Sequence, residues 1–313
     1  MNNSLSAQNI IKIFDGKKPF TAVNDLSFEL FPGESVAFLG PNGAGKSTTI
    51  KLLCGILTPT SGLAFVNGHK AGSFEANKSI GLVFGTRSQL YMHMTVFQCL
   101  DLISEIYFLS GELKKKRMAT LTELFEIGPL LDKRVRTLSL GQRMRCEIVA
   151  ALIHKPSVLL ADEPTIGLDI IAKNSLRELI RRWQKEEKST LLLTSHDLSD
   201  VEALCDRSIL IDHGEKKFDG KLELLKGELS DLRRIEITVS DQEVKLYKHA
   251  SHIFSSKQNN DYIHSFEIRL SQLSMSEALS LLSGHYGNKL QDIKISEVSL
   301  EEVLADRFKT YKS

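Results

Sequence analysis

Residues 40–48 constrain this chain more than any other stretch. They read Gly40-Pro41-Asn42-Gly43-Ala44-Gly45-Lys46-Ser47-Thr48 and fit the pattern G-x-x-x-x-G-K-[ST] of a phosphate-binding loop. The glycines lack a Cβ, so backbone N–H groups can approach phosphate oxygens closely. Lys46 supplies an ammonium group for the β- and γ-phosphates, and Ser47 offers a hydroxyl to Mg²⁺. The loop predicts binding of a nucleoside triphosphate and leaves its use open.

The flanking sequence places this loop between a strand and a helix. The apolar run 36–39 is expected to be a buried strand, and residues 48–53 are expected to form a helix. The N-terminus of a helix carries partial positive charge, so this helix would face the bound anion.

Composition narrows the class of protein. A chain of 313 residues favours one large domain with a small one, and a net charge of +1 argues against a general nucleic-acid surface. The four cysteines show no metal-binding spacing and are expected to be reduced and buried. The N-terminus shows no signal peptide, and no apolar run approaches the roughly 20 residues of a membrane span. We therefore expect no membrane crossing by this chain.

The first part of the chain alternates between expected strands and helices. Runs 158–161 and 191–193 are continuously apolar, as in parallel strands covered on both faces. Residues 96–131 have helical periodicity, interrupted by the basic run 114–117. That run is expected to be a solvated helix face, with a phospholipid contact as the alternative. This pattern predicts an α/β sheet with ligands at the carboxyl ends of the strands.

The pattern of apolar and polar residues changes after residue 227. Runs 235–239, 266–270 and 290–295 alternate like half-exposed strands, and residues 275–282 have helical spacing. Residues 257–261 are expected to be a loop, and Ser299 to Glu302 form a capping box for a final helix. We predict a domain over 1–227, with a helical subdomain at about 92–155, and a small α+β domain over 228–313.

Four further motifs follow the phosphate loop. Residues 138–143 contain Ser139, Gly141 and Gln142, where a helix N-terminus could bind an anion; taken alone, Ser139 is more simply an N-cap. The strand 158–161 ends in Asp162, placed to reach Mg²⁺, and in Glu163, placed to polarise water as a general base.

The last two motifs contain Asp169 and His196. Asp169 could position the nucleotide site or a facing subunit, and His196 follows the strand 191–193, where an imidazole could contact the γ-phosphate. The candidate catalytic groups are therefore Lys46, Glu163 and His196.

The order of these motifs resembles the nucleotide-binding subunit of an ATP-binding-cassette (ABC) transporter over residues 6–225. The resemblance implies a P-loop NTPase cassette that binds ATP and Mg²⁺. It implies a second copy of the cassette, or a close paralogue, so that the two subunits sandwich two ATP molecules head to tail, the phosphate loop of one facing residues 139–142 of the other. Phe14 falls where the family places an aromatic that stacks on adenine.

Finer details are similar to a bacterial branch that serves type-2 ABC exporters. That branch implies a separately encoded transmembrane permease as partner, and a cytoplasmic protein held at the inner face of the membrane through it. No nucleic-acid partner is expected. The resemblance also implies that the permease selects the cargo, which this sequence does not reveal.

One position departs from the family pattern. The family places a Gln after the strand 80–84, where it contacts Mg²⁺ and water; here Gly85 and Thr86 stand at the candidate positions and Gln89 follows. We assign Thr86 as the positional equivalent, a metal-site candidate with a shorter and weaker donor.

Two other functions stay open. A soluble ABC ATPase acting on ribosomes or nucleic acid usually carries two cassettes, coiled coils or zinc modules, none of which is seen here. A nucleotide-dependent regulator that scarcely hydrolyses ATP is motivated by Thr86, although the presence of Glu163 and His196 argues against it.

The departure at Thr86 predicts slower hydrolysis or altered coupling than a Gln would give. We expect Thr86→Gln to raise the ATPase rate or to change its dependence on Mg²⁺ concentration, because the longer amide reaches farther into the site. Steady-state ATPase assays over a Mg²⁺ titration measure both. Identical rate and Mg²⁺ dependence in the variant would remove Thr86 from this role.

Overall fold

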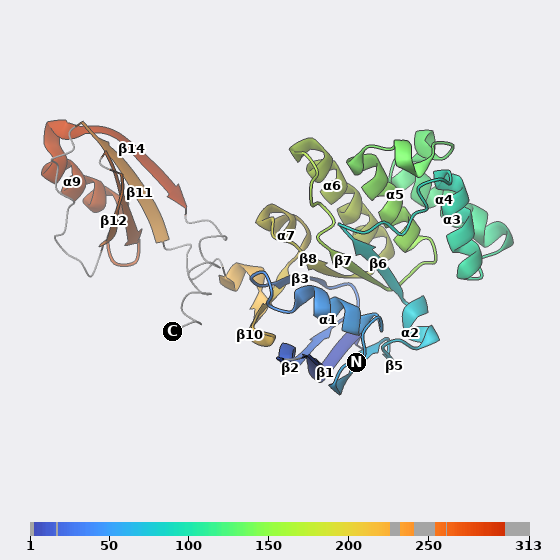
Figure 1. Ribbon diagram of the computed structural model, residues 1–313. Coiled ribbons are helices and arrows are strands. Elements are labelled where there is room, and N and C mark those ends of the chain that lie inside the picture. Colours follow the sequence, from blue (N-terminus) through green and yellow to red (C-terminus); the bar gives the residue numbers. More distant parts are fainter. Residues whose placement is uncertain (1–2, 17, 226–231, 241–253, 261, 298–313) are drawn as a thin grey trace. The chain divides into compact units, whose positions relative to one another are not determined.

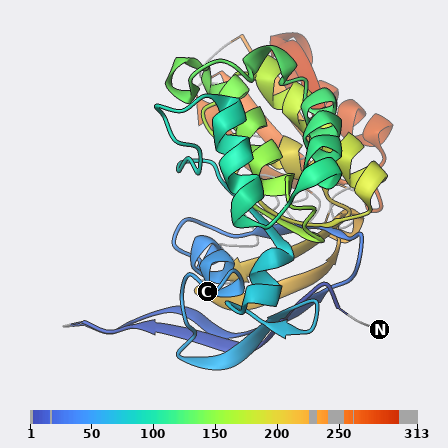
Figure 2. The ribbon, with the colours of Figure 1, turned by 90° about the vertical axis from the view of Figure 1, so that its right-hand side faces the viewer.

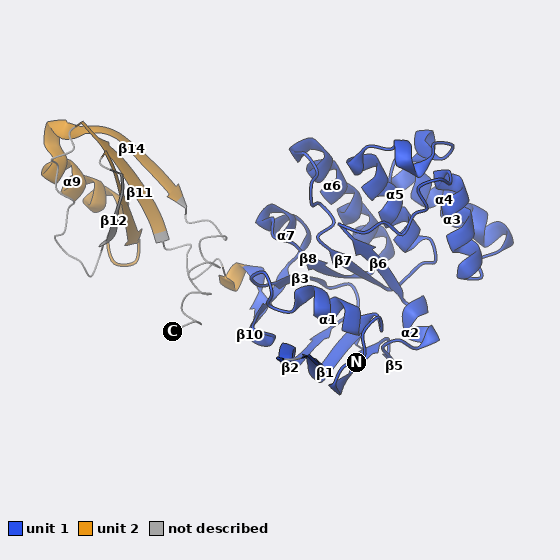
Figure 3. Cartoon of the chain, viewed as in Figure 1, with its two compact units in different colours: residues 1–222 blue, residues 223–313 orange. Residues whose placement is uncertain are grey.

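The computed structural model describes residues 3–16, 18–225, 232–240, 254–260 and 262–297. The chain divides into two compact units, 1–222 and 223–313 (Figure 3). The boundary predicted at 227 falls among residues 226–231, outside the described ones, and stays a prediction. None of the helices in the described ranges is long and apolar enough to span a bilayer.

The first unit contains a six-stranded sheet with the order β10-β9-β3-β8-β7-β6 (Figure 1). Its neighbouring strands pair in parallel except for β10, which pairs antiparallel with β9. The strands are β3 (Ser35–Leu39), β6 (Ile80–Phe84), β7 (Val158–Asp162), β8 (Thr190–Thr194), β9 (Arg207–Asp212) and β10 (Glu215–Lys221). The continuous apolar runs are wholly buried as predicted, since both faces of this sheet are covered.

A second, antiparallel sheet has the order β2-β1-β4-β5. Its strands are β1 (Leu5–Phe14), β2 (Phe20–Leu30), β4 (Ser61–Val66) and β5 (His69–Lys70). Its strands and those of the first sheet contribute side chains to one buried cluster with Ile50, Leu52 and Leu53 of the first helix. That helix, α1 (Lys46–Leu53), lies between the two sheets (Figure 1).

The remaining helices of this unit are mostly on the other side of the six-stranded sheet. Figure 2 shows the green helices of residues 96–152 on the side away from the blue α1. The helices are α2 (Phe74–Lys78), α3 (Val96–Ile106), α4 (Gly111–Leu124), α5 (Leu140–Leu152), α6 (Ile170–Glu187) and α7 (Leu198–Leu204), with short 3-10 turns at Gly128–Leu130 and Val135–Thr137. Helix α5 packs against β6 and against α3.

The expectation of a solvated basic run at 114–117 holds at Lys115 and Lys116 and is wrong at Arg117. The run lies inside α4, and the break in the helical stretch comes earlier, between α3 and α4. Lys115 and Lys116 are exposed, but Arg117 is buried. Its guanidinium pairs with Glu187 at the end of α6 and donates to the carbonyl of Leu152 at 2.9 Å. The charge is tolerated inside because it is paired and hydrogen-bonded.

The second unit has an antiparallel sheet with the order β12-β13-β11-β14. Its elements are β11 (Leu232–Val239), β12 (Phe254–Asn260), β13 (Ile263–Arg269), α9 (Met275–Tyr286), a 3-10 turn at Gly287–Lys289 and β14 (Leu290–Glu297). Alternate residues of β11 and β13 pack against Ala278, Leu282 and Tyr286 of α9. The predicted strands and helix are present, and the unit is α+β as expected.

One prediction in this unit is wrong. Residues 257–260, expected as a loop, belong to β12, whose backbone pairs antiparallel with β13. Ladder hydrogen bonds from a neighbouring strand hold polar residues in extended form despite their low strand propensity. Asp261 and the capping box at Ser299 lie outside the described residues.

The buried pair of Arg117 and Glu187 should stabilise the first unit. We expect Glu187→Gln to lower its free energy of unfolding by about 1–3 kcal/mol, because the guanidinium loses its charged partner. Trp183, the single tryptophan, is fully buried in α6, so its fluorescence during urea unfolding reports on this unit. The exposed neighbour Glu186 supplies the control: Glu186→Gln should stay within about 0.5 kcal/mol of the parent. Equal midpoints for both variants would contradict a stabilising role.

Candidate functional site

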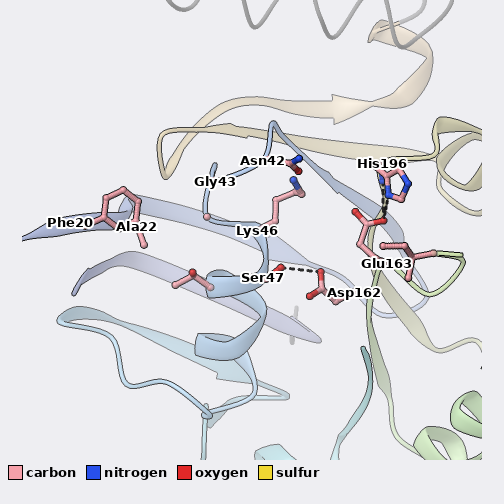
Figure 4. Close-up of a pocket in the computed structure, with 12 residues that line it drawn as sticks. Phe20, Ala22, Asn42, Gly43, Lys46, Ser47, Asp162, Glu163 and His196 are labelled. Atoms are coloured by element: carbon pink, nitrogen blue, oxygen red, sulfur yellow. Dashed lines mark hydrogen bonds and ion pairs between the residues drawn. The ribbon is translucent and has the colours of Figure 1, made fainter. Parts of the chain in front are cut away.

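A cavity of about 570 Å³ opens where the phosphate loop meets the carboxyl ends of β7 and β8. Figure 4 shows the labelled side chains gathered around it. The lining residues are Phe20, Ala22, Asn42, Gly43, Gly45, Lys46, Ser47, Thr48, Asp162, Glu163, Ile166 and His196. Since parallel strands end at the same edge of a sheet, motifs far apart in the sequence meet here.

The phosphate loop is held in a shape that requires glycine before α1. Gly45 has a φ of +103°, and a Cβ there would lie 2.3 Å from the carbonyl oxygen of Ala22 in β2. The N–H of Gly214, in the turn after β9, donates to the carbonyl of Ala44 at 3.0 Å. The loop is thus fixed from two sides, and α1 begins at Lys46 with its N-terminus at the cavity.

Lys46 lies close to two carboxylates. Its ammonium donates to the carbonyls of Gly40 at 2.6 Å and Pro41 at 3.1 Å. Burial lowers the pKa of Lys46 below its usual value, and the negative charges of Glu163 and Asp162 oppose that shift. A cation held between carboxylates and the phosphate loop suits a site that receives a polyanion.

The chain offers oxygen donors for a divalent cation beside Lys46. The Ser47 hydroxyl lies 3.4 Å from Oδ1 of Asp162, and Thr194 donates to the same oxygen at 2.5 Å. Within the described residues no group of three or more His, Cys, Asp or Glu could hold a metal. One carboxylate and a hydroxyl, completed by phosphate oxygens and water, is nevertheless the kind of set that Mg²⁺ takes at nucleotide sites. Ser47 and Asp162 therefore fit Mg²⁺.

Glu163 and His196 form a pair at the mouth of the cavity. Oε2 of Glu163 lies 2.5 Å from Nδ1 of His196 and accepts the His196 backbone N–H at 3.2 Å (Figure 4). Glu163 has a φ of +56°, uncommon for a residue with a side chain, and its N–H donates to the carbonyl of Thr194 at 3.0 Å. The backbone turn after β7 is therefore tied to β8, which brings the carboxylate and the imidazole together.

The end of β6 packs against the backbone of Glu163. The Gly85 N–H donates to the carbonyl of Asp162 at 2.8 Å, and a Cβ on Gly85 would lie 1.9 Å from the carbonyl oxygen of Glu163. Thr86, the next residue, is exposed and is not among the lining residues of the cavity. Its role at the metal stays a prediction.

Gln89 is engaged elsewhere. Its amide donates to the carbonyl of Glu147 in α5 at 3.0 Å and to that of Leu82 in β6 at 3.3 Å. Its N–H donates to the buried carboxylate of Glu147 at 3.1 Å. These bonds fasten the segment after β6 to α5, so Gln89 does not replace the absent family glutamine here.

Residues 139–142 and Asp169 lie apart from the cavity lining but close to each other. Ser139 and Gln142 form a capping box at the start of α5, and Asp169 caps α6 by accepting the Ala172 N–H at 2.8 Å. A Cβ on Gly141 would lie 3.2 Å from Cβ of Ala172. The two motifs thus share one surface, on the N-termini of neighbouring helices.

Two features of the site escaped the sequence reasoning. The predicted adenine-stacking residue Phe14 is 39% exposed and pairs across the sheet with Phe20, which lines the cavity in its place. Phe14 remains a prediction for nucleotide contact. Thr194 is the first residue of the motif 194–197 and is given no role by the sequence, although its hydroxyl binds Asp162; its place at the end of a strand was the available signal.

The fold and the site together define an ATP-binding cassette. The sequence profile of the ABC transporter family matches residues 23–166. The linearmycin resistance ATP-binding protein LnrL of Bacillus subtilis is 33% identical over 96% of this chain and 96% of its own length. The ABC transporter ATP-binding protein NatA of the same organism is 38% identical over 67% of this chain and 86% of its own length.

A solved structure extends the likeness to three dimensions. The ATP-binding cassette MJ0796, dimeric in a post-hydrolysis state and bound to ADP and Pi, matches with a TM-score of 0.62 at 26% identity, over 70% of this chain and 98% of its own. This chain belongs to the ATP-binding proteins of ABC transporters. It is an ATPase, and the predicted family and cassette fold are confirmed.

The contact between Gly85 and Glu163 should be needed for hydrolysis. We expect Gly85→Ala to lower the ATPase kcat by about tenfold or more, because the added methyl must displace the turn that carries Glu163. ATPase assays with a parallel thermal melt separate this from unfolding. Gly128→Ala is the control, since a Cβ there meets only Thr122 Cγ2, at 3.8 Å. Full activity in Gly85→Ala would show that the turn accommodates a side chain without loss.

Proposed function

We propose that this ATPase powers a membrane transporter, and that two copies enclose ATP head to tail. The observation that carries the proposal is the pairing of Glu163 with His196 at the mouth of the phosphate-loop cavity. It places a carboxylate and an imidazole beside the ammonium of Lys46, where the terminal phosphate of ATP would lie.

We assign hydrolysis to the groups around the cavity. Glu163 accepts a proton from water as the water oxygen bonds to the γ-phosphorus, and the bond to the bridging oxygen breaks to release ADP and phosphate. Lys46 stabilises the charge that develops on the phosphate oxygens. His196 holds the Glu163 carboxylate through the 2.5 Å contact. Mg²⁺ held by Ser47 and Asp162 would neutralise part of the phosphate charge.

The second copy explains the surface formed by residues 139–142 and Asp169. The N-terminus of α5 presents backbone N–H groups and lies outside the cavity lining of its own chain. In a head-to-tail pair it would face the nucleotide on the phosphate loop of the partner copy. The dimeric state of the MJ0796 cassette supports this arrangement.

The membrane partner is proposed from an exposed apolar surface. Tyr91, Phe97, Ile106 and Phe108 are 46–74% exposed on and around α3. Exposed apolar side chains that are contiguous mark protein contacts, and the ring of Phe108 lies against that of Phe74, which is also exposed, with 6.4 Å between the ring centroids. We propose that a coupling helix of a separately encoded permease binds here and holds the subunit at the inner face of the membrane. The resistance function in the name of LnrL supports export as the direction.

Glu163→Gln tests the hydrolysis and the dimer together. We expect the ATPase kcat to fall by about 10²- to 10⁴-fold, because the amide cannot accept the proton. If hydrolysis reopens the pair, ATP should then accumulate a stable dimer that light scattering on a sizing column detects, whereas ADP should not.

Glu178→Gln is the matched control, because Glu178 is exposed on α6 and carries the same charge. It should keep the parent rate and the parent elution. A Glu163→Gln variant that hydrolyses ATP at the parent rate would remove Glu163 as the base. Co-purification of the parent with ribosomes or nucleic acid instead of membranes would favour the soluble ABC class.

A further inference from the structure

A buried charged network lies behind the Glu163 and His196 pair, and its centre is Asp200 in α7. The Asp200 side chain is fully buried, and its carboxylate accepts hydrogen bonds from three other segments. Thr165 and Ser195 donate their hydroxyls to Oδ2, the latter at 2.8 Å, and Nε and Nη2 of Arg177 both lie 2.6 Å from Oδ1. Each partner is a hydrogen-bond donor. A buried carboxylate needs such donors because it has lost its hydrogen bonds to water.

The network continues through Asp197. Lys173 and Arg177 of α6 lie 2.6 Å and 3.3 Å from its Oδ2, and Ser199 donates to Oδ1. Burial by itself would raise the pKa of Asp197, but the hydrogen bonds from Lys173 and Ser199 lower it to about 2. Two carboxylates and two cations therefore form one set of paired charges between α6 and α7.

This network fixes the backbone close to Glu163 and His196, the two groups assigned to hydrolysis. Ser195 and Asp197 flank His196 directly, and Thr165 follows Glu163 by two residues. The ring of His196 is 61% exposed, so packing does little to orient it, and its position depends on the backbone that its neighbours fix. Arg177 and Lys173 belong to α6, the helix that Asp169 caps, so the network also joins this backbone to that helix.

We propose that Asp200, held by Arg177, is a positioning residue for ATP hydrolysis that sets His196 and the turn carrying Glu163 at their working separation. Asp200 acts through these residues and does not line the cavity. The inference rests on the hydrolytic roles proposed above for Glu163 and His196. It predicts that loosening the network slows the chemical step and leaves ATP binding nearly unchanged.

Two variants loosen the network in different ways. Asp200→Asn keeps the size but removes the charge and one acceptor oxygen, so Thr165, Ser195 and Arg177 cannot all keep their bonds. Arg177→Lys keeps the charge but loses the planar fork that reaches both Asp200 and Asp197. The second variant also covers the case in which Asp200→Asn does not fold. Asp206→Asn and Arg181→Lys, both at exposed positions, are the matched controls.

The first measurement separates kcat from KM for ATP in purified full-length protein, with thermal melts in parallel. We expect kcat to fall by about 10- to 100-fold in both network variants, since small misplacement of reacting groups has effects of that size. KM should stay within about twofold, and the controls should match the parent. A parent-like kcat in folded Arg177→Lys and Asp200→Asn, or a loss confined to KM, overturns the proposal.

The second measurement is a double-mutant cycle with His196→Ala. Because Arg177 and Asp200 act in part through His196, adding Arg177→Lys or Asp200→Asn to His196→Ala should slow hydrolysis by a smaller factor than the same substitution does in the parent, as single-turnover assays with excess enzyme can detect. Losses that multiply in full would overturn positioning through His196. A parent-like rate in both Glu163→Gln and His196→Ala is a separate result, because it defeats the proposed roles of those residues whatever the network variants do.

Discussion

The parallel alignment of β7 with β8 is the constraint on which the site depends. In that register Asp162 pairs with Thr194, and the threonine hydroxyl binds the aspartate at 2.5 Å. Glu163 directly follows β7, and His196 is the second residue after β8. The two therefore meet at the same edge of the sheet, beside the loop that follows β3. Buried leucines cover both faces of β8, and its backbone pairs with β7 set this register.

Charged groups are buried where polar segments of the cassette must meet. Arg117 joins α4 to the end of α6, Glu147 fastens the segment after β6 to α5, and Asp200 joins α6 and α7 to the turns behind the cavity. Each is hydrogen-bonded within the chain, as desolvation of a charge requires. Hydrogen bonds to such groups depend on distance and angle, whereas apolar packing is not directional. They therefore suit loops whose side chains must be held at fixed distances.

Local patterns predicted the elements that apolar residues build. The continuous runs at 158–161 and 191–193 became buried parallel strands, and the helical spacing at 275–282 became α9. The predictions that were wrong concern polar residues. Residues 257–260 are extended because β13 pairs with them, and Arg117 is buried because Glu187, seventy positions along the chain, reaches it. Neither partner can be recognised from the neighbouring sequence.

The sequence by itself determined that the chain binds a nucleoside triphosphate. A phosphate loop and carboxylates at the end of a strand are local patterns, and their residue types indicate phosphate and metal binding. It determined the family and the residues expected at the nucleotide. Only the tertiary structure decided which of them share a cavity: Ser47, Asp162, Glu163 and His196 do, whereas residues 139–142 and Asp169 form a separate surface. The reason is physical, since distances between side chains follow from strand order and register and from buried partners remote in sequence.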